Sequence, residues 1–408
     1  MTTSADDHGL VEAAAQRDPY PAYARLRADA PIHFSPHWKG WLITRYADVA
    51  TAFRHPGLSA NRMGGYAKVL PPALLEAVSP LIRNLSAWIL MMDPPAQTRI
   101  RGLISSAFTP RFIDGLRPRI AAIVDHLLGD AERAEGPTFD AIAGLAYPLP
   151  VMVIADMLGL PHHDHARLKH WSDALATFLG VAALDPAVVG KAVRAIVEME
   201  AYFREAIAAR RAQPTDDLIS ALVAAHDAGG RLDEQELVST CCALLFGGHE
   251  TTTNLIGNAI HLLLTHPTEL ARLRRDPALL DGAIEEVLRH EAPVQRMGRV
   301  SATDVEIGGA TIPAGGRVYL VMGAAHRDAA QFPDPDRFDI ARKDNRHLAF
   351  GLGNHFCLGA ALGRMEARLA VGELLRRFPD LAPGGEAPAW IDNLTIRGLE
   401  RLPVRLRG

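Results

Sequence analysis

A single cysteine, Cys357, lies in a segment that is otherwise poor in side chains, FGLGNHFCLG at residues 350–359. Structural zinc needs four protein ligands, usually in pairs such as CxxC, and the other two cysteines, Cys241 and Cys242, lie far upstream. A lone thiolate suits a metal that already has most of its ligands, as porphyrin iron does with four ring nitrogens and one axial sulfur. A buried structural cysteine beside a glycine-rich turn is the alternative that Cys357 alone leaves open.

The residues around Cys357 favour the metal interpretation. Gly351 and Gly353 lack side chains, so the backbone could pass close beneath a flat ring and could adopt positive φ. The next segment, LGAALGRMEARLAVGELLRRF at 358–378, predicts a helix. The amides at the start of this helix would point at Cys357 and stabilise its thiolate.

A second candidate segment, FGGHETTTN at 246–254, lies midway along the longest predicted helix. Glycine inside a helix costs about 1 kcal/mol relative to alanine, so the adjacent glycines should bring a compensating gain. A threonine cluster that caps or packs the helix is one interpretation of this segment. The zinc-protease motif HExxH is excluded, because the fourth residue after His249 is Thr253.

EEVLR at 285–289 places Glu286 and Arg289 on one face of a predicted helix. Taken alone, such a pair is most often a solvated surface bridge worth only tenths of a kcal/mol.

The elements that must position these residues are mostly helical. The longest helix should open at Asp233, with Glu236 completing a capping box, and should end before Pro267. Its ~33 residues would extend over ~50 Å, which predicts a helix through the centre of the molecule. A buried helix face is predicted from the periodic spacing of Leu116, Ile120, Ile123 and Leu127.

Strand signals are fewer and shorter than helix signals. They fall at IHF 32–34, WLIT 41–44, VEIGGATI 305–312, RVYLVM 317–322, and the alternating Leu402, Val404 and Leu406 near the C-terminus. The prediction is therefore a mainly α fold with a small β subdomain, formed as one domain over 1–408. This domain would have a strand-rich edge at 30–46 and 300–322, a C-terminal hairpin at 390–408, and a helical body at 95–290 and 357–378.

Composition narrows the function classes. The chain has 408 residues, 48% of them hydrophobic, and a formal net charge of −4, so nothing points to nucleic acid or an anionic membrane. The N-terminal residues lack the basic stretch and apolar run of a signal peptide, and no segment reaches the ~18 apolar residues of a membrane span. The 3 cysteines form no disulfide framework, which favours the cytoplasm.

Residues Phe350, Gly351, Gly353, His355, Cys357 and Gly359, as spaced here, resemble the haem-binding loop of the cytochrome P-450 family of haem-thiolate monooxygenases. The resemblance extends from about Asp18 to Leu406. It implies a P-450-like fold with a long central helix over haem b, and Cys357 as the axial ligand of the iron. It also implies a monooxygenase that uses dioxygen to hydroxylate or epoxidise a hydrophobic small molecule.

The other motifs acquire roles through this resemblance. Glu250 and Thr251 match an acid–alcohol pair that holds water and delivers protons, on a stretch whose small residues leave room for dioxygen. Glu286 and Arg289 match the ExxR motif, whose third partner would be Arg337, in a structural network that locks the cysteine loop.

Propionate anchoring is implied for Arg101, Arg299 and His355. Gln97 stands where a histidine is common; it can still donate a hydrogen bond but carries no charge.

Family position also suggests a substrate pocket of mainly apolar residues, with the 55–92 loop as a lid. Its candidates are Ala243, Phe246, Gly247, Val294, Met297 and Ile396. Residues of this kind are also typical of plain core. Arg99, Arg101, Arg111 and Arg364 could form a basic patch that steers an acidic ferredoxin or flavodoxin, or an ordinary solvated arginine face.

The chain is expected to be a monomer that receives electrons from a separate ferredoxin or flavodoxin and its reductase. Two alternatives remain. One is a peroxide-using, desaturating or ring-coupling enzyme with the same haem; the other, from a different class, is a haem-based gas sensor or binding protein, which would not need the Glu250–Thr251 pair.

Overall fold

The structure is a computed structural model that describes residues 7–12, 15, 17–64, 71–133, 136, 138–180, 185–227 and 232–407. The described helices are α2 Tyr20–Asp29, α3 Tyr46–Ala52, α5 Pro72–Ser86, α6 Ala96–Ala107, α7 Pro110–Arg133, α8 Pro148–Met157, α9 His165–Gly180, α10 Pro186–Ala212, α11 Leu218–Asp227, α12 Glu234–Thr265, α13 Pro267–Arg275, α14 Leu280–His290, α15 Met322–Ala325 and α16 Ala360–Arg377. The described strands are β1 Ile32–Ser35, β2 Gly40–Ile43, β3 Leu58–Ser59, β4 Phe139–Asp140, β5 Met297–Ser301, β6 Val305–Ile307, β7 Ala310–Ile312, β8 Arg317–Leu320, β9 Ala382–Pro383, β10 Ala389–Trp390, β11 Leu399–Arg401 and β12 Pro403–Arg405.

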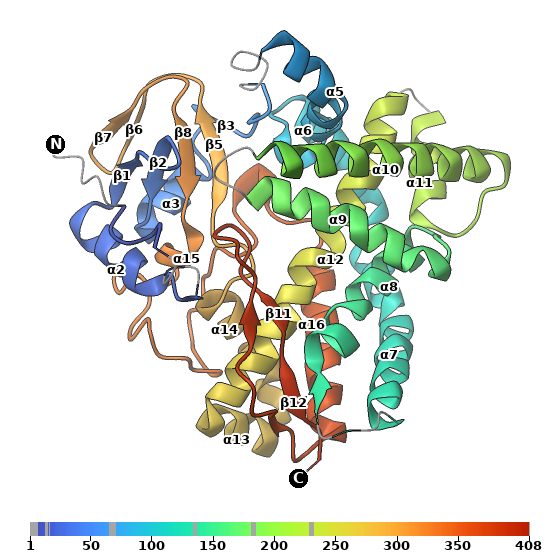
Figure 1. Cartoon of the computed structure of the whole chain (residues 1–408), viewed down its shortest axis with the longest axis vertical. Helices are drawn as coiled ribbons and strands as arrows, with labels where there is room; N and C mark the ends of the chain where they lie inside the picture. Colours follow the sequence, from blue (N-terminus) through green and yellow to red (C-terminus); the bar gives the residue numbers. More distant parts are fainter. Residues whose placement is uncertain are drawn as a thin grey trace.

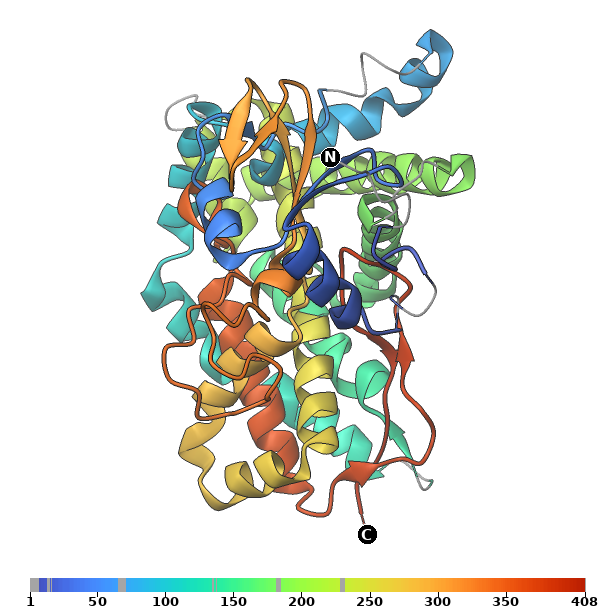
Figure 2. The same ribbon diagram turned by 90° about the vertical axis from the view of Figure 1, so that its left-hand side faces the viewer.

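The long helix α12 passes through the middle of a helical body, and the β region lies to one side (Figures 1 and 2). α12 packs against α8, α9, α10, α14 and α16. It has 32 residues, and Asp233 and Glu236 form both bonds of the predicted capping box. The prediction of a central helix ending before Pro267 is therefore confirmed, as is the mainly α fold with a small β region.

The helix at 110–133 shows why periodicity was informative. Ile120, Ile123 and Leu127 of α7 are buried in the large apolar core beside α8 and α16, as predicted, whereas Leu116 is only half-buried at its margin.

Five strands form one sheet in the order β1-β2-β8-β5-β3, which joins the two predicted strand-rich segments. β2 and β8 are parallel, with Trp41 opposite Val318, and β5 runs antiparallel to β8. Gly308 and Gly309, both at positive φ, form the turn of a separate β6–β7 hairpin.

Two strand predictions were too long. The strand predicted at 317–322 ends at Leu320, and Met322 opens α15. A short apolar run does not distinguish strand from helix, and the following Gly-Ala-Ala favours the helix here. The hairpin predicted at 390–408 is two units: β10 pairs with β11, whereas β12 pairs with β4 and β9. The chain changes sheet at Leu402, whose amide donates to the Asp140 carboxylate.

Among the helices of the described residues, none combines the length and the apolar character that crossing a bilayer requires.

Candidate active site

A cavity of about 440 Å³ lies between α12 and the loop that carries Cys357. Its walls come from α6, α9, α12, α14, β5, the cysteine loop and the segment before β11. The cavity thus brings together most of the residues singled out in the sequence. The predicted site residues that line it are Arg101, Ala243, Phe246, Gly247, Thr251, Val294, Met297, Arg299, Phe350, Gly351, His355, Cys357, Gly359 and Ile396.

The cysteine loop has the geometry that its glycines suggested. Gly351 and Gly353 adopt φ of +67° and +68°, a region that strains other residues. The Cys357 amide donates to the Phe350 carbonyl at 2.9 Å, which closes the loop. The Cys357 thiol is accessible, and the space it faces is the cavity.

The surroundings of the Cys357 thiol act on its pKa in both directions. Burial raises the pKa of Cys357, while the Gly359 amide just before α16, Arg101 and Arg364 act to lower it. A bound metal cation would favour the thiolate outright.

On the opposite wall, the adjacent glycines Gly247 and Gly248 of α12 serve different purposes. A Cβ at Gly247 would meet no atom within 4 Å, so this glycine leaves open space beside the cavity. A Cβ at Gly248 would lie 2.8 Å from Ile154 of α8, so this glycine permits close helix packing. Thr251 lines the cavity, and its hydroxyl donates a long bond of 3.4 Å to the Gly247 carbonyl.

Glu250 faces away from the cavity, toward α9. Its carboxylate lies 3.8 Å from His249 Nε2, and ligand atoms of Asp173, His249 and Glu250 lie within 4.8 Å of one another. Burial raises the pKa of Glu250; His249 acts to lower it and Asp173 acts to raise it. Asp173 accepts from Lys169 at 2.6 Å, and both of these side chains reach solvent. Thr251 at the cavity and Glu250 near Asp173 of α9 are therefore adjacent residues of α12 that face different surroundings.

Cations cluster at one end of the cavity with few carboxylates nearby. Burial lowers the pKa of Arg299 to about 10, with Asp93 acting in the opposite direction, and burial also lowers that of Arg101. Burial and the charges of Arg299 and Arg101 lower the pKa of His355 to about 4, although Asp93 acts to raise it. Asp93 itself accepts hydrogen bonds from Ser59 and Ala60. This uncompensated cluster fits the two carboxylates of a haem.

Gln97 is not among the described residues that line this cavity, and its role as a cofactor-binding residue stays a prediction. The side chain is fully buried, and its Nε2 donates to the Asn354 carbonyl at 2.6 Å. This hydrogen bond ties α6 to the cysteine loop.

All six predicted pocket residues border the cavity. The wall also includes residues that the sequence analysis did not suggest, among them Ile104, Phe178 and Leu288, and it includes Trp88 of the predicted 55–92 lid. Trp88 stacks on Phe246 with ring centroids 5.1 Å apart, which joins the 55–92 segment to α12. Within this segment, 65–70 lie outside the described residues.

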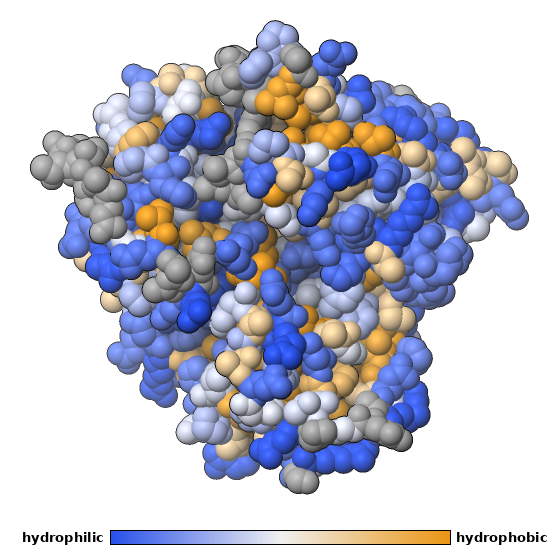
Figure 3. Space-filling model, viewed as in Figure 1, coloured by the Kyte–Doolittle hydropathy of each residue, from blue (hydrophilic) through white to orange (hydrophobic). Residues whose placement is uncertain are grey.

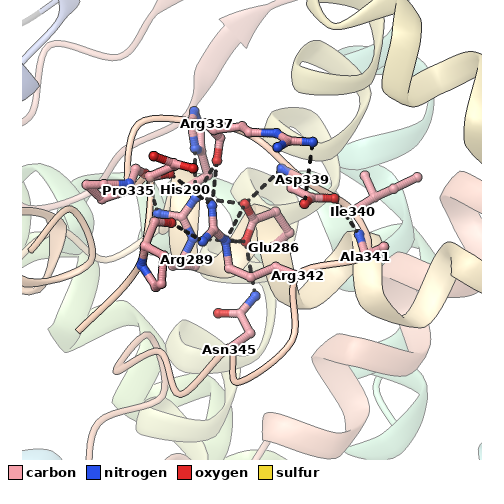
Figure 4. Close-up of polar contacts among 12 residues, drawn as sticks. Glu286, Arg289, His290, Pro335, Arg337, Asp339, Ile340, Ala341, Arg342 and Asn345 are labelled. Atoms are coloured by element: carbon pink, nitrogen blue, oxygen red, sulfur yellow. Dashed lines mark hydrogen bonds and ion pairs between the residues drawn. The ribbon is translucent and has the colours of Figure 1, made fainter. Parts of the chain in front are cut away.

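The Glu286–Arg289 pair is buried rather than solvated (Figure 4). Arg289 donates to both carboxylate oxygens of Glu286, at 2.7 and 2.8 Å. The second guanidinium on Glu286 is that of Arg342, at 3.1 Å. Arg337 had been predicted as the charged partner, but it joins only through its carbonyl, which accepts from Arg289 at 3.0 Å; its guanidinium lies near Asp339.

Two arginines of the predicted basic patch form ion pairs with carboxylates, which reduces the positive charge of this surface. Arg99 pairs with Glu236, Arg364 pairs with Glu285, and Arg101 faces the cavity. Arg111 is exposed on α7.

Comparison with known proteins agrees with this geometry. The family described as Cytochrome P450 matches residues 87–401. The cytochrome P450 monooxygenase PikC of Streptomyces venezuelae is 44% identical over 398 residues, covering 96% of this chain and 91% of that protein. The vitamin D(3) 25-hydroxylase of Pseudonocardia autotrophica is 38% identical over 411 residues, covering 99% and 98%. The crystal structure of P450BioI in complex with hexadec-9Z-enoic acid ligated acyl carrier protein gives a TM-score of 0.90 at 36% identity, covering 97% of this chain and 100% of that one.

The family match spans both walls of the cavity, the central helix and the cysteine loop. The names of the PikC and vitamin D(3) 25-hydroxylase relatives describe a monooxygenase and a hydroxylase. The chain therefore belongs to the cytochrome P450 family, and it is a haem-containing monooxygenase that oxidises an organic substrate.

Proposed function

We propose that Cys357 is the axial thiolate ligand of a noncovalently bound haem b, and that Arg101, Arg299 and His355 hold its propionates. The observation that carries this proposal is the pairing of an accessible thiol with an uncompensated cation cluster in one cavity. The sequence contains no CxxCH segment for covalent haem attachment, which supports haem b. Phe350, Gly351 and Gly359 shape the loop around the ligand, and the whole chain forms one haem-binding domain.

The haem, when bound, supplies the dioxygen activation, and the protein supplies protons and orientation. The Thr251 hydroxyl holds the proton or water nearest the cavity. Glu250, on the α9 side, returns a proton to Thr251. Its raised pKa keeps the Glu250 carboxyl protonated at higher pH than an ordinary carboxyl. Asp173 and Lys169 connect this pair to solvent.

The substrate is a hydrophobic small molecule. Ala243, Phe246, Val294, Met297 and Ile396 border the cavity with mainly apolar surface, and Gly247 adds room. Val294 and Ile396 face each other in an isolated antiparallel bridge, so two distant segments form one wall. The vitamin D(3) 25-hydroxylase relative, by its name, acts on a substrate of this kind.

A ferredoxin or flavodoxin with its reductase supplies electrons at the face that carries Arg111, and the protein acts as a cytoplasmic monomer. The free cysteines of the described chain suit a reducing compartment.

The test compares the wild type, Cys357→Ala and Thr251→Ala. The wild type should release haem b into acidified organic solvent and show the carbon monoxide spectrum of thiolate-ligated haem. It should form product with reduced ferredoxin and air, and Cys357→Ala should lose both the spectrum and the product. Product from peroxide alone, at the rate seen with air, would favour the peroxide-using alternative. A haem-bound protein with no product, unchanged by Thr251→Ala, would favour the sensor.

A further inference from the structure

Arg296 is a buried cation at the wall of the active-site cavity that none of the roles above uses. It lies between α14 and β5, and its exposed fraction is only 5%. The cavity wall includes Arg296 together with Thr395, Tyr319 and Arg317. The groups that act on the charge of Arg296 are Tyr23 and Tyr319, whereas Asp93 acts on Arg299, so Arg296 lies apart from the proposed propionate site.

The guanidinium of Arg296 is held firmly but is incompletely bonded. Its Nε donates to the Thr395 hydroxyl at 2.9 Å. Its centre lies 3.7 Å from the Trp38 ring and 5.3 Å from the Tyr319 ring. These rings stabilise the charge through their faces but accept no conventional hydrogen bond. Nη1 is buried and has no hydrogen-bond partner.

Other buried arginines nearby have carboxylate partners. Arg289 bonds Glu286, Arg327 bonds Asp336, and Arg397 bonds Glu291. Within the described residues, no ion pair joins Arg296 to a carboxylate. Burial lowers its pKa to about 10, so the side chain keeps its charge at neutral pH. A buried charge without a counter-ion is costly, and arginine pairs best with a planar carboxylate.

The charges of the residues that line the cavity also favour an anionic ligand. Its lining includes the cations Arg62, Arg101, Arg296, Arg299 and Arg317, whereas Glu366 is the carboxyl among the described lining residues. Burial raises the pKa of Glu366 well above its ordinary value, so this group offers no negative charge at neutral pH. The haem propionates account for Arg101 and Arg299 and leave Arg296 without an anion.

We propose that Arg296 binds a carboxylate carried by the substrate, so that the preferred substrates are hydrophobic monocarboxylic acids. The inference rests on the proposed function of this cavity as the haem and substrate site. The stacked guanidinium is already ordered, so little conformational entropy is lost when the acid binds. Anchoring one end at Arg296 also fixes which carbon faces the Cys357 side of the cavity.

The test uses dodecanoic acid and its methyl ester, which share a chain but differ in charge. Their dissociation constants are measured by calorimetry with the haem-loaded protein, and independently by the spin-state change. The wild type should bind the acid about tenfold to a hundredfold more tightly than the ester, as expected of a hydrogen bond to a charged group. Arg296→Gln should lose this preference while keeping its affinity for the ester.

Matched variants make the result specific. Arg296→Lys keeps the charge without the planar fork and should retain an intermediate preference for the acid. Arg317→Gln removes an exposed arginine from the same cavity wall and should leave the preference unchanged. Equal wild-type affinity for acid and ester, or a preference that survives Arg296→Gln, would overturn the proposal.

Haem content and the carbon monoxide spectrum of each variant test the proposed function separately. A wild type with thiolate-ligated haem that oxidises esters and acids alike retains that function and refutes the role of Arg296. A protein without such haem refutes the proposed function itself. The acid–ester comparison on the wild type needs no variant, so it holds even if Arg296→Gln fails to fold.

Discussion

Glu286→Gln should destabilise the protein by about 3–5 kcal/mol, because it removes the carboxylate charge that, within the described residues, pairs with the buried guanidinium groups of Arg289 and Arg342. Glu286 and Arg289 both have side chains that are 0% exposed, and that of Arg342 is 9% exposed. The carboxylate of Glu286 accepts from Arg289, Arg342, Asn345 and the Asp339 amide. A glutamine amide would place a donor against these donors and would leave both arginines uncompensated.

The assay is urea unfolding followed by circular dichroism, with the free energy obtained by linear extrapolation. The matched control is Glu386→Gln, which makes the same chemical change at the Arg401–Glu386 pair, whose side chains are 52% and 65% exposed. This control should cost about 0.2–1 kcal/mol. If Glu286→Gln costs no more than the control, the network does not depend on a buried charge balance and the reasoning fails.

Further predictions concern the proton pair, the cysteine loop and acid stability. Thr251→Ala should lower product formed per electron by about a hundredfold, the lower end of a general-acid contribution, measured as product against NADPH consumed; unchanged coupling would contradict the role. The wild type should lose coupling as pH rises through the raised pKa of Glu250, and a Glu250→Gln profile that still falls would assign the loss to another group. Gln97→Ala removes the part-buried hydrogen bond to the Asn354 carbonyl and should cost about 0.5–1.5 kcal/mol in urea unfolding, whereas a neutral result would show that the 2.6 Å bond is dispensable. Burial opposes ionisation of Glu285, but its ion partners outweigh this and lower its pKa to about 2. Its stabilisation should therefore be full above pH ~4.3 and be lost as pH falls toward 2, and Glu285→Gln should show a smaller loss of unfolding free energy over that range.

Local signals in the sequence were sufficient where a residue's role depends on its immediate neighbours. The glycines beside Cys357 predicted positive φ, and the structure has it at both. The capping box of Asp233 and Glu236 predicted the start of the central helix. Such features are decided within a few residues, so a single sequence contains them.

The sequence did not predict the correct contact where the path of a loop decides which side chains meet. Arg342 rather than Arg337 reaches Glu286, and the loop that carries both arginines contains two residues at positive φ, Asp334 and Asp344. No spacing rule reports on such turns. The sequence did not predict a role for Arg296 for a similar reason. Its described contacts are with Trp38 and Thr395 rather than with a carboxylate, and these contacts depend on the packing of distant segments.

The backbone contacts of α12 bear on how this enzyme could acquire new substrates. Gly248 lies against Ile154, Gly257 against Ile142, and Gly363 of α16 against Thr252, so α12 has little freedom to shift or to accept bulk on those sides. Adaptation is left to the part of the wall that Trp88 and the end of α9 form. Figure 3 shows apolar surface over α5 and α10, the helices next to these residues. Libraries that diversify this wall and keep α12 constant should therefore yield altered substrate ranges with few losses of folded protein.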